Sequence, residues 1–371
     1  MRLAGHRTNP CRRADGRGSG SRESERCTVG INNLRAEHAA HAPGSPAMTT
    51  ETAGGSAVGG SAAGRGPRVV ILLSTYNGSA FLLEQLRSFT AQTYTNWTLL
   101  WRDDGSSDDT VAIMEAFTAR RHDCMRVREP AGQFGATASF FLLLRNAQEM
   151  LHATDLVAFA DQDDVWLPCK LARGVAALRA IEAERPALYF ARQVLVDDVL
   201  HTIGESPKFR RAPAFPAALT QNIAGGCTMI LNFGAVALVA ATVPLSVAHH
   251  DWWCYVLITA AGGTCLCDDA KVILYRQHGR NAIGAPASAL RRAYAALCRG
   301  PSAFMALFRV HLAALAEHPN LLSECARRDV VRLRNAMRGG PASRLATLRS
   351  LDLQRQTRAE TLMFYLWFII G

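Results

Sequence analysis

Residues 156–166 read Leu-Val-Ala-Phe-Ala-Asp-Gln-Asp-Asp-Val-Trp, an apolar run that passes directly into three carboxylates. The run 156–160 has the length and apolar character of a buried β-strand. Carboxylates crowded at the end of such a strand repel one another unless a cation lies between them. Oxygen ligands of this kind suit Mg²⁺ or Mn²⁺, and Mg²⁺ is commonly held by one or two carboxylates together with substrate phosphates. The stretch therefore predicts a metal site that receives a diphosphate.

The same carboxylates allow a second interpretation, in which they cap a helix that begins near Trp166 and Leu167. Aspartate is common at helix N-termini because its charge complements the helix dipole. The residues by themselves leave both interpretations open. We expect Asp161 and Asp163 to serve the metal site and Asp164 to cap the helix that follows.

Segments typical of strands and helices alternate around this stretch. The predicted strands are residues 69–73, 97–101, 126–127 and 156–160, and the predicted helices are residues 79–92, 110–120, 138–151 and 171–184. Such alternation is typical of an α/β fold in which helices cover both faces of a parallel sheet. With 371 residues and 49% apolar content, the chain is long enough to bury a large core.

Three polar loops follow predicted strands: residues 74–78 (Ser-Thr-Tyr-Asn-Gly), 103–106 (Asp-Asp-Gly-Ser) and 161–164 (Asp-Gln-Asp-Asp). The carboxyl ends of parallel strands share one edge of a sheet, and ligands collect there. The chemistry of the loops is complementary, since Tyr76 can stack on a base, Asp104 can accept a base N–H, and the third loop can hold a metal. We therefore expect the three loops to form one site.

Each of these side chains also has an ordinary structural interpretation. Tyr76 can be a packed surface aromatic, and Asp103 and Asp104 can cap a helix that begins near Ser107 and Thr110. These alternatives remain open for each residue alone. Three such loops at successive strand ends are harder to explain by chance.

The net charge of +10 is unevenly distributed along the chain. Residues 1–66 contain 9 arginines and 5 acidic residues, residues 67–285 contain 19 basic and 21 acidic residues, and residues 286–371 contain 13 arginines and 5 acidic residues. The first segment is rich in Gly, Ser and Ala without hydrophobic periodicity, which predicts a disordered basic extension, and Met48 is a candidate for the true start. We predict that residues 67–285 form the α/β domain.

The composition and hydrophobic spacing of residues 286–371 predict a basic helical region. Its final apolar residues, 362–370, are too few to span a bilayer, which takes about 20. An arginine-rich segment with an aromatic apolar end suits lying on an anionic membrane surface. Packing of the same apolar side against the α/β domain is the alternative, and both remain open. We expect a cytoplasmic protein, with attachment to the inner face of the plasma membrane if the first interpretation holds.

Several motifs occur in a fixed order between about Arg68 and Gly284. They are residues 74–78, 92–97 (Gln-Thr-Tyr-Thr-Asn-Trp), 103–110 (Asp-Asp-Gly-Ser-Ser-Asp-Asp-Thr), 161–168 (Asp-Gln-Asp-Asp-Val-Trp-Leu-Pro) and 250–253 (His-Asp-Trp-Trp). In this order they resemble family 2 glycosyltransferases, and within that family the rhamnosyltransferase-like branch of bacterial polysaccharide assembly. The resemblance implies a GT-A fold, a Rossmann-like nucleotide-diphospho-sugar transferase fold with a mixed, mainly parallel sheet flanked by helices. Here a C-terminal helical extension would follow it.

The resemblance also implies roles for individual residues. Residues 161–163 occupy the family's Asp-x-Asp position, so Asp163 would be the principal metal ligand, and Asp161 would approach the donor's ribose or sugar and the same metal. His278, in the loop 275–281, would touch the metal or the diphosphate. The nucleobase and ribose would be bound by residues of the first two loops, namely Ser74, Tyr76, Asn77, Asp103 and Asp104.

Asp251 matches the family's catalytic base. Inverting sugar transfer needs a base that faces the acceptor hydroxyl across the anomeric carbon, and a cation that neutralises the leaving diphosphate. Asp251 precedes the apolar segment 252–261, so we expect it at a helix N-terminus in a pocket walled by Trp252 and Trp253. The alternative is a plain N-cap with both tryptophans in the core.

Together these features predict a metal-dependent inverting glycosyltransferase that uses Mg²⁺ or Mn²⁺. Its donor would be a nucleoside-diphosphate sugar, with dTDP-rhamnose as the candidate, and its acceptor a glycan or lipid-linked precursor of a polysaccharide or glycolipid. A nucleotidyltransferase is one alternative, but it should carry a glycine-rich loop with Lys or Arg after the first strand, and residues 74–78 contain no basic residue. A non-enzymatic sugar-nucleotide sensor also remains open. Nucleic acid is not an expected partner, because it would not explain the acidic motifs.

Overall fold

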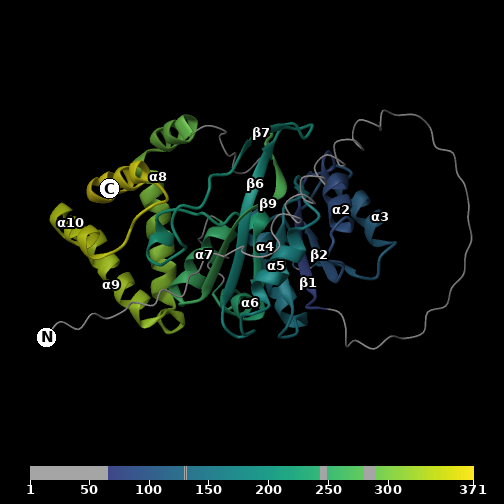
Figure 1. Ribbon diagram of the computed structural model, residues 1–371, viewed down its shortest axis with the longest axis horizontal. Helices are drawn as coiled ribbons and strands as arrows, with labels where there is room; N and C mark the ends of the chain where they lie inside the picture. Colours follow the sequence, from purple (N-terminus) through teal and green to yellow (C-terminus); the bar gives the residue numbers. More distant parts are fainter. Residues whose placement is uncertain (1–65, 129, 131, 243–248, 280–288) are drawn as a thin grey trace, which may run out of the picture.

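The computed structural model of the protein describes residues 66–128, 130, 132–242, 249–279 and 289–371. The predicted N-terminal extension, including Met48, lies outside the described residues up to residue 65. Figure 1 shows a central sheet with helices against it, and a layer of C-terminal helices on the side away from the first strands.

The strands of the first half of the chain run parallel to one another. β1 (Val69–Thr75) pairs with β2 (Trp97–Asp103) on one side and β4 (Leu156–Ala160) on the other, and β2 pairs with β3 (Cys124–Arg126). The helices that accompany them are α2 (Leu82–Thr90), α3 (Thr110–Thr118), α4 (Ala136–Met150) and α5 (Lys170–Leu178). The predicted alternation of strands and helices is therefore confirmed.

The second half of the sheet mixes both directions. Its strands are β5 (Val165–Trp166), β6 (Ala187–Val196), β7 (Thr202–Glu205), β8 (Ile230–Asn232) and β9 (Thr264–Arg276). From β4 the order continues through β8, β6 and β9 to β5, and β7 pairs with β6. The long β6–β9 pairing is parallel, whereas β8 and β5 pair antiparallel with their neighbours and β7 pairs antiparallel with β6. The mixed sheet flanked by helices that the resemblance implied is confirmed.

Both faces of the sheet are covered, which explains why β1 is apolar from Val69 to Leu73. Side chains along a strand point in turn to opposite faces. Val70 therefore joins the buried cluster that contains Phe140 of α4, whereas Ile71 joins the cluster that contains Phe89 of α2. A strand buried on both sides reads as a continuous apolar run rather than an alternating one.

The segment after Asp164 corrects one expectation. Val165–Trp166 is the short strand β5, which pairs with β9, and α5 begins only at Lys170. The Trp166 ring is fully buried and lies 4.6 Å from the ring of Phe89, centroid to centroid. Strand pairing and burial of the tryptophan thus hold this segment extended, so Asp164 is not the cap of the following helix.

Two further helices bring the remaining polar residues to the sheet. α6 (Phe233–Ala240) and α7 (His250–Ala260) contribute to the same core cluster as α4. Short 3₁₀ turns, η1 (Ala217–Leu219) and η2 (Gly226–Thr228), lie in the segment before β8. η2 contacts both α7 and the sheet, which places the loop around it beside the start of α7.

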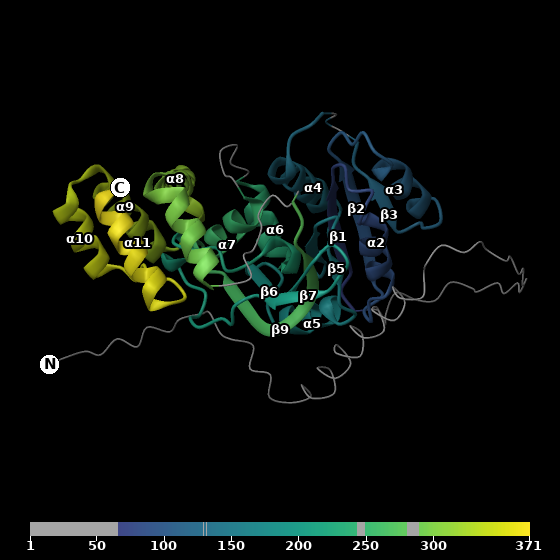
Figure 2. The same cartoon turned by 90° about the horizontal axis from the view of Figure 1, so that it is seen from above.

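The C-terminal region is helical, as predicted. It consists of α8 (Ala289–Glu317), η3 (Pro319–Leu321), α9 (Glu324–Arg338), α10 (Pro341–Ser350) and α11 (Arg358–Ile370). Figure 2 shows these helices as a layer beside α7. His311 of α8 is fully buried, with its ring centroid 4.9 Å from Trp252 and 6.2 Å from Trp253 of α7, so the extension packs directly on the helix that carries Asp251.

The final helix, α11, has two apolar sides with different surroundings. Phe364 and Phe368 are fully buried against Phe308 of α8, so this apolar side packs within the C-terminal extension. Leu362 and Ile370, in contrast, are 71% and 62% exposed. Among the described residues, none of the helices combines the length and the apolar character needed to cross a membrane.

Candidate functional site

The three strand-end loops meet at one edge of the sheet, as predicted. The side-chain amide of Gln162 joins the third loop to the first, because its Oε1 accepts from the Tyr76 backbone N–H at 2.8 Å and its Nε2 donates to the Tyr76 carbonyl at 2.9 Å. The first and second loops are joined by Asn77, whose backbone N–H donates to the Ser106 hydroxyl at 2.9 Å and whose Oδ1 accepts from the Ser107 N–H at 2.8 Å. The site is therefore one hydrogen-bonded unit.

The first loop carries an accessible aromatic ring. Tyr76 is 45% exposed, Ser74 at the end of β1 is half-buried, and the Asn77 backbone has a positive φ of 47°. Gly78 allows the close approach of the third loop, since a Cβ at this position would lie 2.2 Å from Gln162 Oε1. Tyr76 is thus free to stack on a planar ligand, while its backbone is fixed from both sides.

The two aspartates of the second loop accept hydrogen bonds from different donors. Asp103 accepts from the hydroxyls of Thr75 (2.9 Å) and Ser106 (2.6 Å), and it is half-buried. Asp104 is buried and accepts from Arg102 Nη1 at 2.6 Å and from the backbone N–H groups of Phe134 (2.8 Å) and Gly135 (2.7 Å). Although burial opposes it, these bonds hold the pKa of Asp104 below its usual value. Contact of either carboxylate with a nucleobase stays a prediction.

Asp163 and His278 are neighbours, as a shared metal would require. His278 Nε2 lies 2.8 Å from Asp163 Oδ2, and both side chains are partly accessible. The imidazole stacks on the Phe81 ring with 5.0 Å between centroids. Burial and the charges of Asp163 and Asp251 raise the pKa of Asp161 to about 7, which places all three carboxylates in one electrostatic neighbourhood.

Behind this edge lies a buried group of ionisable side chains. One ligand atom each of Asp161, Asp164 and Cys227 lie within 4.8 Å of one another. Lys170 is fully buried beneath them, donating to the Cys227 carbonyl at 2.6 Å, with its Nζ 3.1 Å from the centre of the Trp166 ring. Burial keeps the pKa of Cys227 well above its usual value, so this thiol stays protonated.

Arg276 at the end of β9 fixes the backbone of the acidic loop. Its guanidinium is fully buried, donates to the Asp163 carbonyl at 2.9 Å and pairs with Glu84 of α2. Its backbone N–H donates to Asp164 Oδ1 at 3.2 Å, while Asp164 Oδ2 is buried without a hydrogen-bond partner among the described residues. Asp164 therefore ties the acidic loop to β9.

Asp251 lies in the first turn of α7, one residue after the start of the helix, and His249 is the N-cap residue. Its Oδ2 accepts from Asn222 Nδ2 at 3.0 Å and from the Gly226 N–H at 3.1 Å. A Cβ on Gly226 would lie 3.2 Å from Asp251 Cβ and 2.9 Å from His250 Nε2, so a glycine permits this close approach. The carboxylate is half-buried and lies near enough to Asp161 for its charge to raise the pKa of Asp161.

Several residues that hold the site together received no role from the sequence. Gln162 and Arg276 lie inside segments that resemble family motifs, so their polar character was visible there. Lys170 and Asn222 gave no such signal, because their importance depends on contacts with Cys227 and Asp251 that are distant in sequence.

Comparisons with known proteins agree on the enzyme class. Residues 70–236 match the family model described as Glycosyl transferase family 2. The dTDP-rhamnosyl transferase RfbG of Shigella flexneri is 25% identical over 226 residues, which cover 57% of this chain and 74% of that protein. The UDP-Glc:alpha-D-GlcNAc-diphosphoundecaprenol beta-1,3-glucosyltransferase WfgD of Escherichia coli is 32% identical over 103 residues, which cover 28% of this chain and 38% of that protein.

A solved structure resembles the chain over a larger part of its length. The crystal structure of S. aureus TarS 1–349 aligns with a TM-score of 0.49 and 14% sequence identity, covering 82% of this chain and 81% of that one.

Proposed function

We propose that this glycosyltransferase, whose residues 70–236 belong to glycosyl transferase family 2, moves a sugar from a nucleoside-diphosphate donor to an acceptor hydroxyl with inversion. The observation that supports the proposal is the position of Asp251, whose Oδ2 accepts from Asn222 Nδ2 and the Gly226 N–H and whose charge raises the pKa of Asp161 at the edge formed by the strand-end loops. A general base would there lie across the donor's anomeric carbon from the leaving diphosphate.

The donor nucleotide would bind to the first two loops. The exposed Tyr76 ring can stack on the base, and Ser74, Asn77 and Asp103 can contact the base or ribose. Asp104 would act mainly by holding the loop at Phe134, since protein donors already occupy both of its oxygens. We infer dTDP-rhamnose as the candidate donor, because the curated relative RfbG is a dTDP-rhamnosyl transferase.

The residues present fit a divalent metal. Asp163 and His278 converge within 2.8 Å at an accessible edge, and Asp161 adds a second carboxylate. This mixture of oxygen and imidazole ligands suits Mn²⁺, and the carboxylates alone suit Mg²⁺. The soft thiol of Cys227 suits neither, so we place the ion at Asp163 rather than at the group of Asp161, Asp164 and Cys227. When bound, such an ion would neutralise the charge that develops on the leaving diphosphate.

A donor screen tests the proposal directly. With Mn²⁺ or Mg²⁺, one nucleoside-diphosphate sugar at about 100 times its Kd is expected to raise the melting temperature by about 5–10 °C. The same sugar nucleotide with EDTA should give a much smaller shift, because the diphosphate then lacks its cation. The measurement is differential scanning fluorimetry, followed by mass spectrometry of products with a glycan or lipid-linked acceptor. Protection by a nucleoside triphosphate and a sugar 1-phosphate, with sugar-nucleotide synthesis, would instead identify a nucleotidyltransferase.

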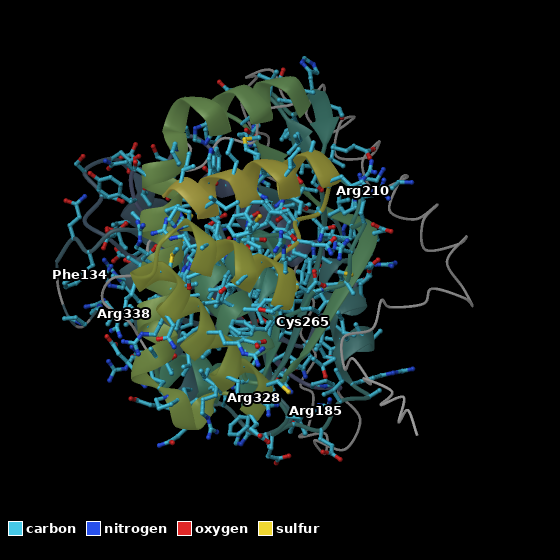
Figure 3. The ribbon with its side chains drawn as sticks, turned by 90° about the vertical axis from the view of Figure 1, so that its left-hand side faces the viewer. Phe134, Arg185, Arg210, Cys265, Arg328 and Arg338 are labelled. Carbon is cyan, nitrogen blue, oxygen red and sulfur yellow. The ribbon has the colours of Figure 1, made fainter. Side chains whose placement is uncertain are left out.

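We also propose that the protein works at the cytoplasmic face of the plasma membrane, held there by its C-terminal helices. Leu362, Leu366 and Ile370 are 71%, 56% and 62% exposed and are spaced by four residues, so they lie on one side of α11. Arginines are exposed on the neighbouring helix α9, and Figure 3 shows Arg328 and Arg338 among the C-terminal helices. Exposed aliphatic side chains together with basic residues suit an anionic lipid surface.

Replacing Leu362, Leu366 and Ile370 together by serine is expected to lower binding to vesicles of phosphatidylglycerol and phosphatidylethanolamine by at least about tenfold. The melting temperature should change little, because these side chains are already exposed. Co-sedimentation measures the bound fraction. The matched control is Val199→Ser, at a residue 63% exposed before β7. Equal sedimentation of the triple variant and the wild type would refute the membrane contact.

A further inference from the structure

A pocket lies between the α/β domain and the C-terminal extension, next to Tyr255 of α7. Its volume is about 340 Å³, and it is walled by residues 210–223, residues 352–356 and Tyr255 of α7. Gln356 fixes the two segments to each other, since its Oε1 accepts from the backbone N–H groups of Arg210 (2.8 Å) and Arg211 (3.0 Å). The pocket is therefore built by defined contacts between the α/β domain and the extension.

The lining of this pocket is polar and carries an excess of positive charge. It contains three arginines, Arg210, Arg211 and Arg355, and one acidic residue, Asp352. Asp352 lies 3.6 Å from Arg211 and partly neutralises it. Glu360 also acts on Arg355, but its carboxylate is held by Thr357 in the capping box of α11. At least one cationic charge is therefore left without an anion from the lining.

The arginines of the lining also offer hydrogen-bond donors. Arg355 Nε is buried without a hydrogen-bond partner among the described residues. Arg210 is exposed, and Figure 3 shows it at the edge of the molecule beside the C-terminal helices. Guanidinium groups present several N–H donors in a fixed plane that matches the oxygens of a phosphate. The lining is thus suited to a phosphate group more than to a neutral sugar.

The pocket adjoins the proposed base through two separate elements. Tyr255 follows Asp251 by four residues on α7, so the two side chains lie on one face of the helix. Gln221 and Ile223 line the pocket, and Asn222 between them donates to Asp251 Oδ2 at 3.0 Å. A molecule that presents a hydroxyl to Asp251 can therefore extend into this pocket.

We call this cavity the arginine pocket, after Arg210, Arg211 and Arg355 in its lining. We propose that the arginine pocket binds a phosphate or diphosphate group of the sugar acceptor. The inference rests on the proposed function, in which Asp251 receives the acceptor hydroxyl. The phosphate can belong to a lipid-linked sugar or to a glycan that carries phosphate. Both sources present the same anionic oxygens to Arg210 and Arg355.

Binding of two metal-independent probes tests this pocket in the full-length chain. Glucose 1-phosphate and farnesyl phosphate are titrated calorimetrically in EDTA, which removes the cation from the donor site. The wild type is expected to bind, and Arg210→Glu should weaken binding at least about tenfold, because a charged hydrogen-bond donor becomes a repelling anion. Arg185→Glu makes the same charge change at an exposed arginine that lines neither wall, and it should leave binding unchanged. Figure 3 shows the two arginines well apart.

The two probes distinguish the sources of the phosphate. Tighter binding of farnesyl phosphate supports a lipid-linked acceptor, and equal binding supports a phosphate-bearing glycan. Absence of binding to the wild type, or equal binding to Arg210→Glu, would overturn the proposal. An Arg210→Glu enzyme that transfers sugar with an unchanged acceptor KM would overturn it too, while leaving the proposed function intact. Phosphate binding that depends on Arg210 in a chain without transferase activity supports the pocket and counts only against the proposed function.

Discussion

Replacing Asp251 by asparagine is expected to lower kcat by about 10²–10⁴-fold, with little change in the KM for the sugar nucleotide. The amide cannot accept the proton of the acceptor hydroxyl, whereas the donor is held by the strand-end loops around Gln162 and Asp163. The loss should therefore fall on the chemical step. Steady-state kinetics with the donor identified by the screen measure both constants.

The substitution is close to isosteric, so a purely structural role should leave a different signature. Asn222 Nδ2 and the Gly226 N–H both donate to the same oxygen of Asp251, and the asparagine carbonyl can take its place, while the bond that Oδ1 accepts from the Trp252 N–H is lost. The melting temperature should thus stay within a few degrees of the wild type. Asp109→Asn is the matched control, because Asp109 is an exposed N-cap residue of α3 whose side chain makes no capping bond. An Asp251→Asn enzyme with kcat within about threefold of the wild type would remove the base assignment.

The parts of the fold that could be predicted are those whose pattern is local. The run 69–73 is apolar and rich in β-branched residues, and Leu156–Ala160 is apolar throughout, so each identifies a strand without reference to the rest of the chain. β5 could not be found in this way. Its two residues, Val165 and Trp166, are held in a strand by pairing with Ile273 and Leu274, more than a hundred positions away. The acidic residues before it favoured the start of a helix, but pairing with β9 makes the segment a strand.

The same distinction between local patterns and long-range contacts applies to the candidate site. The meeting of the three loops followed from the rule that parallel strands expose their carboxyl ends at one edge, and the bonds of Gln162 to Tyr76 agree with it. The role of Asp164 did not follow, because its partner is the backbone of Arg276 at the end of another strand. The arginine pocket could not be predicted from the sequence either. Gln356 and Arg210 are separated by 146 positions, and only the docking of the extension brings them together.

Replacing Asp163 by alanine is expected to abolish metal-dependent protection by the sugar nucleotide and to lower kcat/KM by more than about 100-fold. Removal of groups that merely support a metal ligand already costs about 10–100-fold in affinity or activity, so loss of a ligand should exceed that range. The arrangement offers few substitutes, since Asp164 is fully buried and the thiol of Cys227 is a soft ligand that suits neither Mg²⁺ nor Mn²⁺. Titration of Mn²⁺ in the presence of the donor, followed by fluorimetry, measures the loss of metal affinity separately from turnover.

The pairing of Asp163 with His278 adds a second prediction, about how the losses of the single and double variants combine. Because His278 Nε2 and Asp163 Oδ2 lie 2.8 Å apart, both would serve the same ion, and His278→Gln should also weaken Mn²⁺ binding. The double variant should lose less than the sum of the two single losses, as expected for residues that share one partner. Asp198→Ala is the control, since this carboxylate is exposed and Arg276 donates to the backbone carbonyl of Asp198, which the substitution keeps. Additive losses would show that Asp163 and His278 do not act on one shared ion. Mn²⁺ affinity that survives Asp163→Ala would show that the metal is held elsewhere, and the group of Asp161 and Asp164 would then become the site to test.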